Sequence, residues 1–544
     1  MTTQAEVHTP GTVRTRARSA WRPALVVLAA VGLFVLYWRQ SESVAVSSDG
    51  ASIVLQAHAL LHGNLLLHNW RLADVTFYTT ELPQYALIVS VLGLGGWVVH
   101  VGAAMTYTLL VVLAAWLAKG DARGRAGAAR ALLATGVMVA PQLSATQIVL
   151  LSPDHTGTAV PVLVTWLLID RVTPDRWKPA RWLVPLMVFV LLTWTMIGDS
   201  VVLITCIAPL VLVVLIRSCL GLIRRGEQRS ASRWYELSLA GAAAVAGGLG
   251  SAGPRVIAAL GGYRQAPVEA DTTLISVRHQ AWVTFQAVLE LFGANVFNAR
   301  PGIELVFVWL HLVGATLVIC AFVFALSQLY RVGDLVVSVF AVAIVFNLGA
   351  YMFSAHALDI LGAREIAAVL PLGAVLAGRV LGEPLLAVAR KARRASLVLW
   401  LALGVIAAGY LGTLVYGAAQ PPVPPANQPL ANWLVAHGLT DGLAPYWQAN
   451  STTLASGGRV TVSGVADAPD QKLVPYEWEA EDANYDPSQR DATFVVAEGA
   501  QLPWVRGAAE HTFGLPQRTY SYDGYTIMVW DSNLLLSLGR PGIV

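Results

Sequence analysis

Long apolar stretches recur along this chain, and they constrain its fold more than any other feature. A helix needs about 20 apolar residues to cross the ~30 Å hydrocarbon core of a bilayer. Charged residues make up only 13% of the chain, about half of the ~25% typical of soluble domains. The sequence therefore predicts a polytopic α-helical membrane protein with roughly eleven transmembrane helices, near residues 22–38, 97–118, 131–150, 158–170, 183–197, 200–219, 236–259, 304–329, 335–353, 366–381 and 396–418.

The distribution of Lys and Arg predicts the orientation of these helices. If the N-terminus is cytoplasmic and the helices alternate in direction, the cytoplasmic segments hold 23 Lys and Arg residues and the opposite loops hold seven. Cytoplasmic loops carry such an excess in membrane proteins. The first apolar stretch has no good cleavage site after it and is interpreted as an uncleaved anchor. We therefore expect a multi-pass protein of the cell membrane with its C-terminal domain outside the cytoplasm.

The character of the chain changes at about residue 420. Residues 1–419 are predicted to form the transmembrane domain with functional outer loops, and residues 420–544 a small extracytoplasmic α/β domain. Pro421–Pro425 supplies a stiff spacer between them. The pattern beyond it predicts a helix at 428–438, strands at 458–465 and 492–497, and a hairpin at 520–530 that turns at Asp523-Gly524.

The first outer loop, residues 39–96, is unusually long for a connector, and long ordered loops are usually functional. It carries Asp49 close to the first helix. Residues 51–61 follow with apolar side chains on one face, which predicts an amphipathic helix lying in the membrane interface. A polar element, Phe77–Tyr85, then contains Glu81-Leu82-Pro83.

These features resemble the GT-C class of glycosyltransferases, which are multi-spanning enzymes that use polyprenyl-phosphate-linked sugars. The resemblance covers the architecture of essentially the whole chain, and it favours the cell-envelope enzymes of actinobacteria. The residues that carry it are Asp49–Asn64, Phe77–Tyr85, Tyr446–Asn450 and Gly457–Val462. It implies transfer of a hexose or pentose from a polyprenyl-phosphate donor to a lipid, glycan or protein acceptor.

The resemblance assigns Asp49 as the catalytic base, or as the group that orients the acceptor. An acceptor hydroxyl needs a carboxylate within hydrogen-bond reach while the lipid phosphate leaves the sugar. The alternative is that Asp49 caps the helix that follows it. Glu81 matches the acid of the family's Pro-containing element, with Tyr78 beside it as a substrate-binding candidate; Glu81 is alternatively a solvated loop carboxylate.

The second outer loop contributes Asp154 and His155 as further substrate-binding candidates. An Asp-His pair at the mouth of a membrane helix is a functional candidate by default. The alternatives are a helix start shaped by Pro153 and Asp154, or a metal site at His155. No second ligand accompanies His155 at metal spacing. We therefore expect no cofactor, and a divalent metal is not required by this reading.

A late outer loop carries Arg364 and Glu365. A guanidinium at a helix mouth can hold a phosphate through two hydrogen bonds while a prenyl tail stays in lipid, and the resemblance assigns this task to Arg364. The alternative is an arginine that pairs with Glu365 and anchors the helix end.

Several function classes are disfavoured. The net charge of +3 gives no reason to expect nucleic acid as a partner. Gly247–Gly250 lies in an apolar stretch and is interpreted as helix-packing material rather than a nucleotide loop. Two alternatives to the enzyme stay open: a non-catalytic scaffold that keeps the GT-C-like fold, and a lipid or solute transporter.

Overall fold

The computed structural model describes residues 12–151, 153, 155–171, 182–223, 230–267, 276–331, 333–391 and 396–539. Each of the eleven apolar stretches predicted from the sequence is mainly helical within this part of the chain, and the stretch 131–150 is interrupted at Val139–Gln142. The helices that correspond to them are α1 (Thr12–Ser41), α4 (Trp97–Lys119), α5 (Gly124–Met138) with α6 (Thr146–Val149), α7 (His155–Arg171), α8 (Leu183–Gly198), α9 (Ala208–Ile223), α10 (Ser230–Ala259), α12 (Ile303–Ser327), α13 (Leu335–Met352), α14 (Val369–Lys391) and α15 (Ser396–Ala418).

The chain is a multi-pass membrane protein, although the count of eleven spans is not confirmed. Within the described ranges, six helices are long and apolar enough to cross a membrane. A seventh span is formed if α5 and the segment Leu143–Val149 count as one, but these are bent by 78° at Val139–Gln142. The helix α8 is apolar but has only 16 residues, and α7 has 17.

Glycines allow close packing where the bundle is tightest. A Cβ atom at Gly250 of α10 would lie 2.5 Å from the Met196 Cβ of α8, so the two helix backbones approach closely here. Gly247 and Gly250 of the predicted packing stretch therefore lie at helix contacts. At the opposite end from the sheet, Arg379 of α14 joins Asp170 of α7 at 2.6 Å and Asp334, the N-cap of α13, at 2.7 Å.

The C-terminal region forms a mixed six-stranded sheet in the order β5-β4-β3-β7-β9-β8. β4, β3 and β7 are parallel, and β5, β9 and β8 run antiparallel to their neighbours. The predicted hairpin is confirmed as β8 and β9, which turn at Asp523-Gly524. The strands are β3 (Asp441–Ala444), β4 (Thr461–Asp467), β5 (Leu473–Pro475), β7 (Phe494–Glu498), β8 (Arg518–Tyr522) and β9 (Tyr525–Val529), and the helices α16 (Gln428–Ala436), α17 (Tyr446–Ala455), α18 (Leu502–Phe513) and α19 (Leu535–Leu538).

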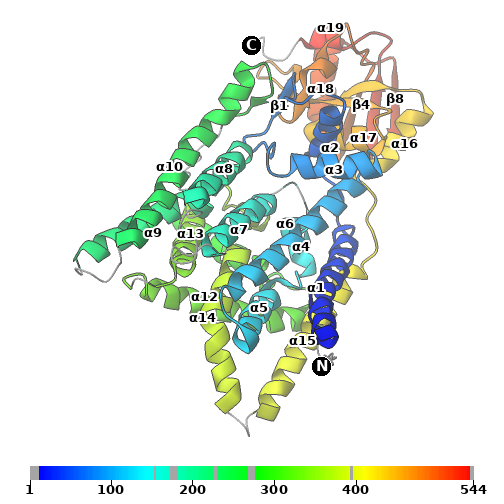
Figure 1. The fold of residues 1–544 in the computed structure, drawn as a ribbon. Coiled ribbons are helices and arrows are strands. Elements are labelled where there is room, and N and C mark those ends of the chain that lie inside the picture. Colours follow the sequence, from blue (N-terminus) through cyan, green and yellow to red (C-terminus); the bar gives the residue numbers. More distant parts are fainter. Residues whose placement is uncertain are drawn as a thin grey trace, which may run out of the picture.

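The sheet region sits on one end of the helix bundle, which we call the sheet end (Figure 1). A second, three-stranded sheet joins it to two loops of the bundle: β1 (Trp70–Leu72) lies between β2 (Arg264–Gln265) and β6 (Ala480–Glu481). Arg71 of β1 reinforces this junction through Asp482, with Nε 2.7 Å from the carboxylate. Loops far apart in the sequence are therefore held at one place.

Two helices at the sheet end differ from the sequence-based expectation. The helix α2 (Ser48–Leu61) was expected to lie in the membrane interface with one polar face free, but it packs between α3 (Leu82–Leu92) and α17 (Figure 1). Eight of its residues are buried because protein covers both sides. The helix α11 (Val277–Leu291) was not predicted, since its apolar positions are interrupted by polar residues and fall within an expected loop.

Candidate active site at the sheet end of the bundle

The element Phe77–Tyr85 is docked on the end of α8. The Phe77 amide donates to the Gly198 carbonyl at 2.9 Å, and the Trp194 indole N–H donates to the Thr79 carbonyl. A Cβ at Gly198 would lie 2.7 Å from the Thr79 hydroxyl, so this close approach needs glycine. The docking fixes the start of α3 and, with it, the side chain of Glu81.

Glu81 is not a solvated loop carboxylate, because only 1% of the residue is exposed. Its carboxylate packs against Gly157 in the first turn of α7. Burial of a carboxylate requires polar partners, and Glu81 does take part in further interactions in the folded protein. The structure therefore brings Glu81 and the His155 end of α7 together.

Replacing Gly157 by Ala is expected to destabilise the protein by about 1–3 kcal/mol, because the new methyl group would overlap the Glu81 carboxylate. Thermal unfolding in detergent would measure the effect. Gly136→Ala is a matched control, since a Cβ at this helical position meets no atom within 4 Å. Equal melting temperatures for the two variants would contradict the close contact.

His155 lies between two carboxylates. Its Nδ1 is 2.7 Å from Asp199 Oδ2, and its Nε2 is 2.8 Å from Glu365 Oε2. Both ring nitrogens can donate only when the imidazole is protonated, so the geometry fits an imidazolium held by two anions. The Asp199 carboxylate also accepts from the Thr158 hydroxyl and, at 2.8 Å, from the Val201 amide. Asp199 thus orients His155.

The pKa of Glu365 is lowered to about 2. Burial alone would raise it, but the positive charges of His155, His356 and Arg364 outweigh that effect. Because the folded pKa lies below the ordinary 4.5, ionised Glu365 stabilises the fold fully above about pH 4.5 and loses this contribution as the pH falls toward 2.

This shift gives a pH-dependent stability prediction. One pKa unit corresponds to about 1.4 kcal/mol, so Glu365→Gln is expected to lower the free energy of unfolding by about 3 kcal/mol at neutral pH. The difference from the wild type should shrink steadily between pH 4.5 and pH 2. Denaturant unfolding in detergent at several pH values would measure it, and a pH-independent difference would contradict the ion pair.

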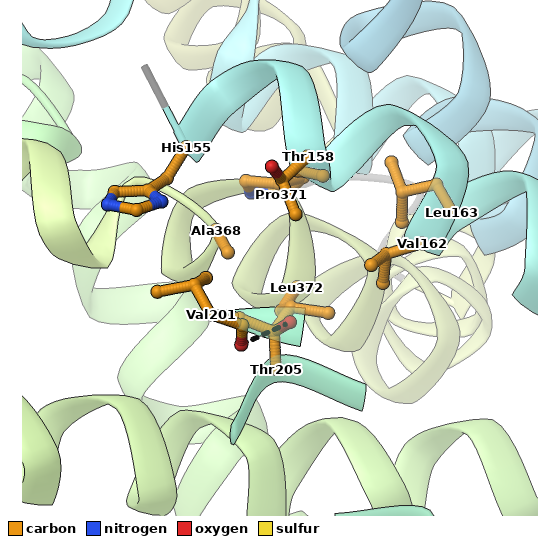
Figure 2. A pocket seen from close by; sticks show the side chains of 10 residues that line it. His155, Thr158, Val162, Leu163, Val201, Thr205, Ala368, Pro371 and Leu372 are labelled. Carbon is orange, nitrogen blue, oxygen red and sulfur yellow. Dashed lines mark hydrogen bonds between the residues drawn. The ribbon is translucent and has the colours of Figure 1, made fainter. Parts of the chain in front are cut away.

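A narrow cavity extends from His155 into the bundle (Figure 2). His155 and Thr158 line one end of it, Thr205 adds a second hydroxyl, and apolar side chains of α7, the start of α14 and the turn after α8 line the rest. The apolar part is formed by Ala159, Val162, Leu163, Val201, Ala368, Pro371 and Leu372. The charged cluster at His155 therefore lies at one end of a mainly apolar cavity.

Arg364 and Glu365 belong to the 3₁₀ segment Ile360–Ile366, which precedes α14. The Arg364 side chain is 52% exposed and its Nε lies 3.5 Å from Glu365 Oε1. Its positive charge also acts on Glu479 of the sheet region. It lowers the pKa of this carboxyl, although burial and the nearby Asp49 charge raise that pKa by more. The charge of Arg364 thus acts on the His155 cluster, through Glu365, and on a second acidic cluster, through Glu479.

The second acidic cluster contains Asp49. The alternative that Asp49 caps the helix that follows it is wrong. Ser47 is the N-cap of α2 and accepts from the Gly50 amide at 3.2 Å, while Asp49 is the second residue of the helix. The Tyr446 hydroxyl of α17 contacts Asp49 Oδ1. The same hydroxyl lies 2.9 Å from Glu479 Oε2. Tyr446 and Glu479 therefore bring the sheet region into contact with the first-loop acid.

Tyr78, a predicted site residue, contacts a different part of the chain from these clusters. The Tyr78 hydroxyl donates to the Leu65 carbonyl at 2.6 Å, and its ring lies beside Tyr263. Asp154 lies outside the described residues. Within the described part of the chain, no group of three or more His, Cys, Asp and Glu side chains is arranged to hold a metal ion.

Sequence reasoning missed Asp199 as a partner of His155, and it missed Glu479 and Asp74. Asp74 follows β1; burial and the neighbouring Glu365 raise its pKa, while His155 and His356 lower it. No local motif marks these acids, because each becomes a neighbour of the site only through folding. The exception is Asp199, whose place at the end of an apolar helix was a usable signal.

No protein-family model matches this chain, and no curated protein matches its sequence. Among solved structures, the fold is similar to that of ArnT from Cupriavidus metallidurans, crystallised with undecaprenyl phosphate. The TM-score is 0.52 at 15% identity, over 93% of this chain and 97% of the other. The archaeal oligosaccharyltransferase AglB from Archaeoglobus fulgidus, in complex with an inhibitory peptide and a dolichol-phosphate, gives a TM-score of 0.49 at 12% identity, over 95% and 74%. The likeness to ArnT confirms a GT-C-like fold.

Proposed function

We propose that this chain is a membrane glycosyltransferase that moves a hexose or pentose from a polyprenyl-phosphate donor to an extracytoplasmic lipid, glycan or protein acceptor. The observation that carries the proposal is the position of Asp49. It lies in the first turn of a packed helix, at the sheet end of a GT-C-like fold, with only part of its surface covered. The structure of ArnT with undecaprenyl phosphate supports a lipid-phosphate donor.

In the proposed reaction, Asp49 takes the proton of the acceptor hydroxyl as that oxygen bonds to the anomeric carbon of the sugar. The bond between this carbon and the donor phosphate oxygen breaks, and its electron pair stays on the polyprenyl phosphate. Arg364 stabilises the charge that develops on the phosphate. Its half-exposed guanidinium can contact a ligand while remaining held by Glu365.

The other predicted substrate-binding residues differ in how a substrate reaches them. Glu365, with 22% of its side chain exposed, can contact a bound sugar beside Arg364. His155 and Glu81 are almost fully buried, so in this proposal they act by holding Glu365 and the start of α7 in place. Asp154 and Tyr78 remain proposed contacts to sugar or acceptor.

The proposal includes a membrane arrangement. We place the N-terminus in the cytoplasm, about eleven spans across the membrane, and residues 420–544 as an outer domain after a transmembrane domain of residues 1–419. An envelope enzyme of actinobacterial type fits the residues quoted above. This arrangement puts both acidic clusters on the outer side, where a lipid-linked sugar is the available donor class. A metal ion is not part of the proposed reaction.

Transfer of radiolabelled sugar from purified polyprenyl-phosphate donors to membrane acceptors tests the function. We expect label from at least one hexose or pentose donor to enter lipid, glycan or protein when the folded protein is present. The control is the same membrane fraction without the protein. Absence of transfer from a panel of donors, by protein that elutes as a folded species, would favour a non-catalytic scaffold.

A further inference from the structure

The Tyr446 hydroxyl lies between two carboxylates that belong to different parts of the chain. One is Asp49 of the first loop, and the other is Glu479 of the sheet region, 2.9 Å away. A hydroxyl has one proton, so it can donate to only one of them. The second contact is favourable only if that carboxyl carries a proton and donates to the Tyr446 oxygen. The cluster is therefore built to hold one additional proton.

Glu479 is the better location for this proton. It is more deeply buried than Asp49, and only 7% of the residue is exposed. Burial, followed by the nearby Asp49 charge, raises the pKa of Glu479 well above its ordinary range. Asp49 lies in the first turn of α2, where the helix dipole favours a negative charge. A proton on Glu479 rather than on Asp49 agrees with the deeper burial of Glu479, with the direction of its pKa shift and with the position of Asp49 at the start of α2.

The backbone at Glu479 adopts an unfavourable conformation. Its φ angle is +48°, a left-handed conformation that non-glycine residues rarely adopt. The side-chain amide of Asn450 donates to the Glu479 backbone carbonyl at 2.9 Å. The two residues after Glu479 form β6, which pairs with β1. Strained positions of this kind persist where the surroundings over-determine them, and they cluster at functional sites.

We propose that Glu479 is a positioning residue that acts on Asp49 through Tyr446. Protonated Glu479 donates to the Tyr446 oxygen, and the Tyr446 proton is thereby committed to Asp49 Oδ1. Among the described residues, no donor to Asp49 Oδ2 is found, so this oxygen is left to take the acceptor proton. The role in turnover rests on the proposed function, whereas the shared proton does not.

The groups that face Glu479 come from four elements. They are Asp49 and Ser52 of α2, Tyr446 of α17, Arg364 of the 3₁₀ segment, and Tyr476 in the loop after β5. Burial raises the pKa of Tyr476, and the charges of Asp49 and Glu479 raise it further. As the pH rises and Glu479 ionises, both carboxylates compete for the Tyr446 proton. Turnover is then expected to fall on the alkaline side.

Glu479→Gln and Tyr446→Phe separate this role from a structural one. The Gln amide is neutral and can still donate to Tyr446, so Glu479→Gln should retain turnover within about twofold at neutral pH and lose the alkaline fall. Tyr446→Phe should lower kcat about ten- to a hundredfold with little change in KM, because Asp49 loses its orientation. Adding Glu479→Gln to Tyr446→Phe should change kcat no further.

Infrared difference spectra of the purified protein test the shared proton without any activity. We expect a protonated-carboxyl band in the wild type at neutral pH that is missing from folded Glu479→Gln. Identical carboxyl bands in the two proteins would overturn the inference. So would a Glu479→Gln variant as inactive as Asp49→Asn. If the band is present but no donor supports transfer, the shared proton stands and the proposed function fails.

Discussion

Asp49→Asn is expected to reduce sugar transfer by about 10²- to 10⁴-fold, the range that a positioned general base contributes. Asn keeps the size of the side chain and can still accept from Tyr446 through its carbonyl oxygen. It cannot take the proton of an acceptor hydroxyl. The loss should therefore appear in kcat, with little change in the apparent affinity for the lipid donor.

The control for Asp49→Asn is a carboxylate at the same end of the molecule outside both clusters. Glu510 of α18 is partly exposed and pairs with Arg506 within its own helix, so Glu510→Gln should retain full transfer. Both variants should match the wild type in expression and melting temperature. Transfer that survives Asp49→Asn would leave the enzyme in place but would remove Asp49 from its active site.

His155→Ala is expected to cost about 3–5 kcal/mol of folding free energy, because it leaves buried charges without their partner. The Asp199 side chain is fully buried and that of Glu365 is 22% exposed, and both contact the imidazole. The cluster joins α7, the end of α8 and the segment before α14. Its loss should loosen the whole sheet end of the bundle. Chemical denaturation in detergent would measure the change.

Two comparisons make the His155 prediction specific. His356→Ala removes an exposed histidine from the same region and should change the free energy of unfolding by less than about 0.5 kcal/mol. Adding Glu365→Gln to His155→Ala should recover part of the loss, because one of the unpaired charges is then removed. A His155→Ala protein as stable as His356→Ala would contradict the buried ion pair.

The sequence alone determined the membrane class, the helical stretches, the change of character near residue 420 and the β8–β9 hairpin. These features depend on local apolar length and turn chemistry, which are written in consecutive residues. It also singled out Asp49, Glu81, Arg364 and Glu365 with the help of the resemblance to the GT-C class, and His155 as part of an Asp-His pair at the mouth of a membrane helix. The structure brings the last four to one end of the bundle and places Asp49 at the same end, in contact with Tyr446.

Only the tertiary structure decided how these residues are partnered. His155 meets Asp199 and Glu365 across separations of 44 and 210 residues, and Tyr446 meets Asp49 across 397. Such pairs form because β1 pairs with β6 and because Gly157 and Gly198 let loops approach helix ends. The burial of α2 has the same origin. A pattern of apolar residues shows that a face needs covering, but not whether lipid or the rest of the chain covers it.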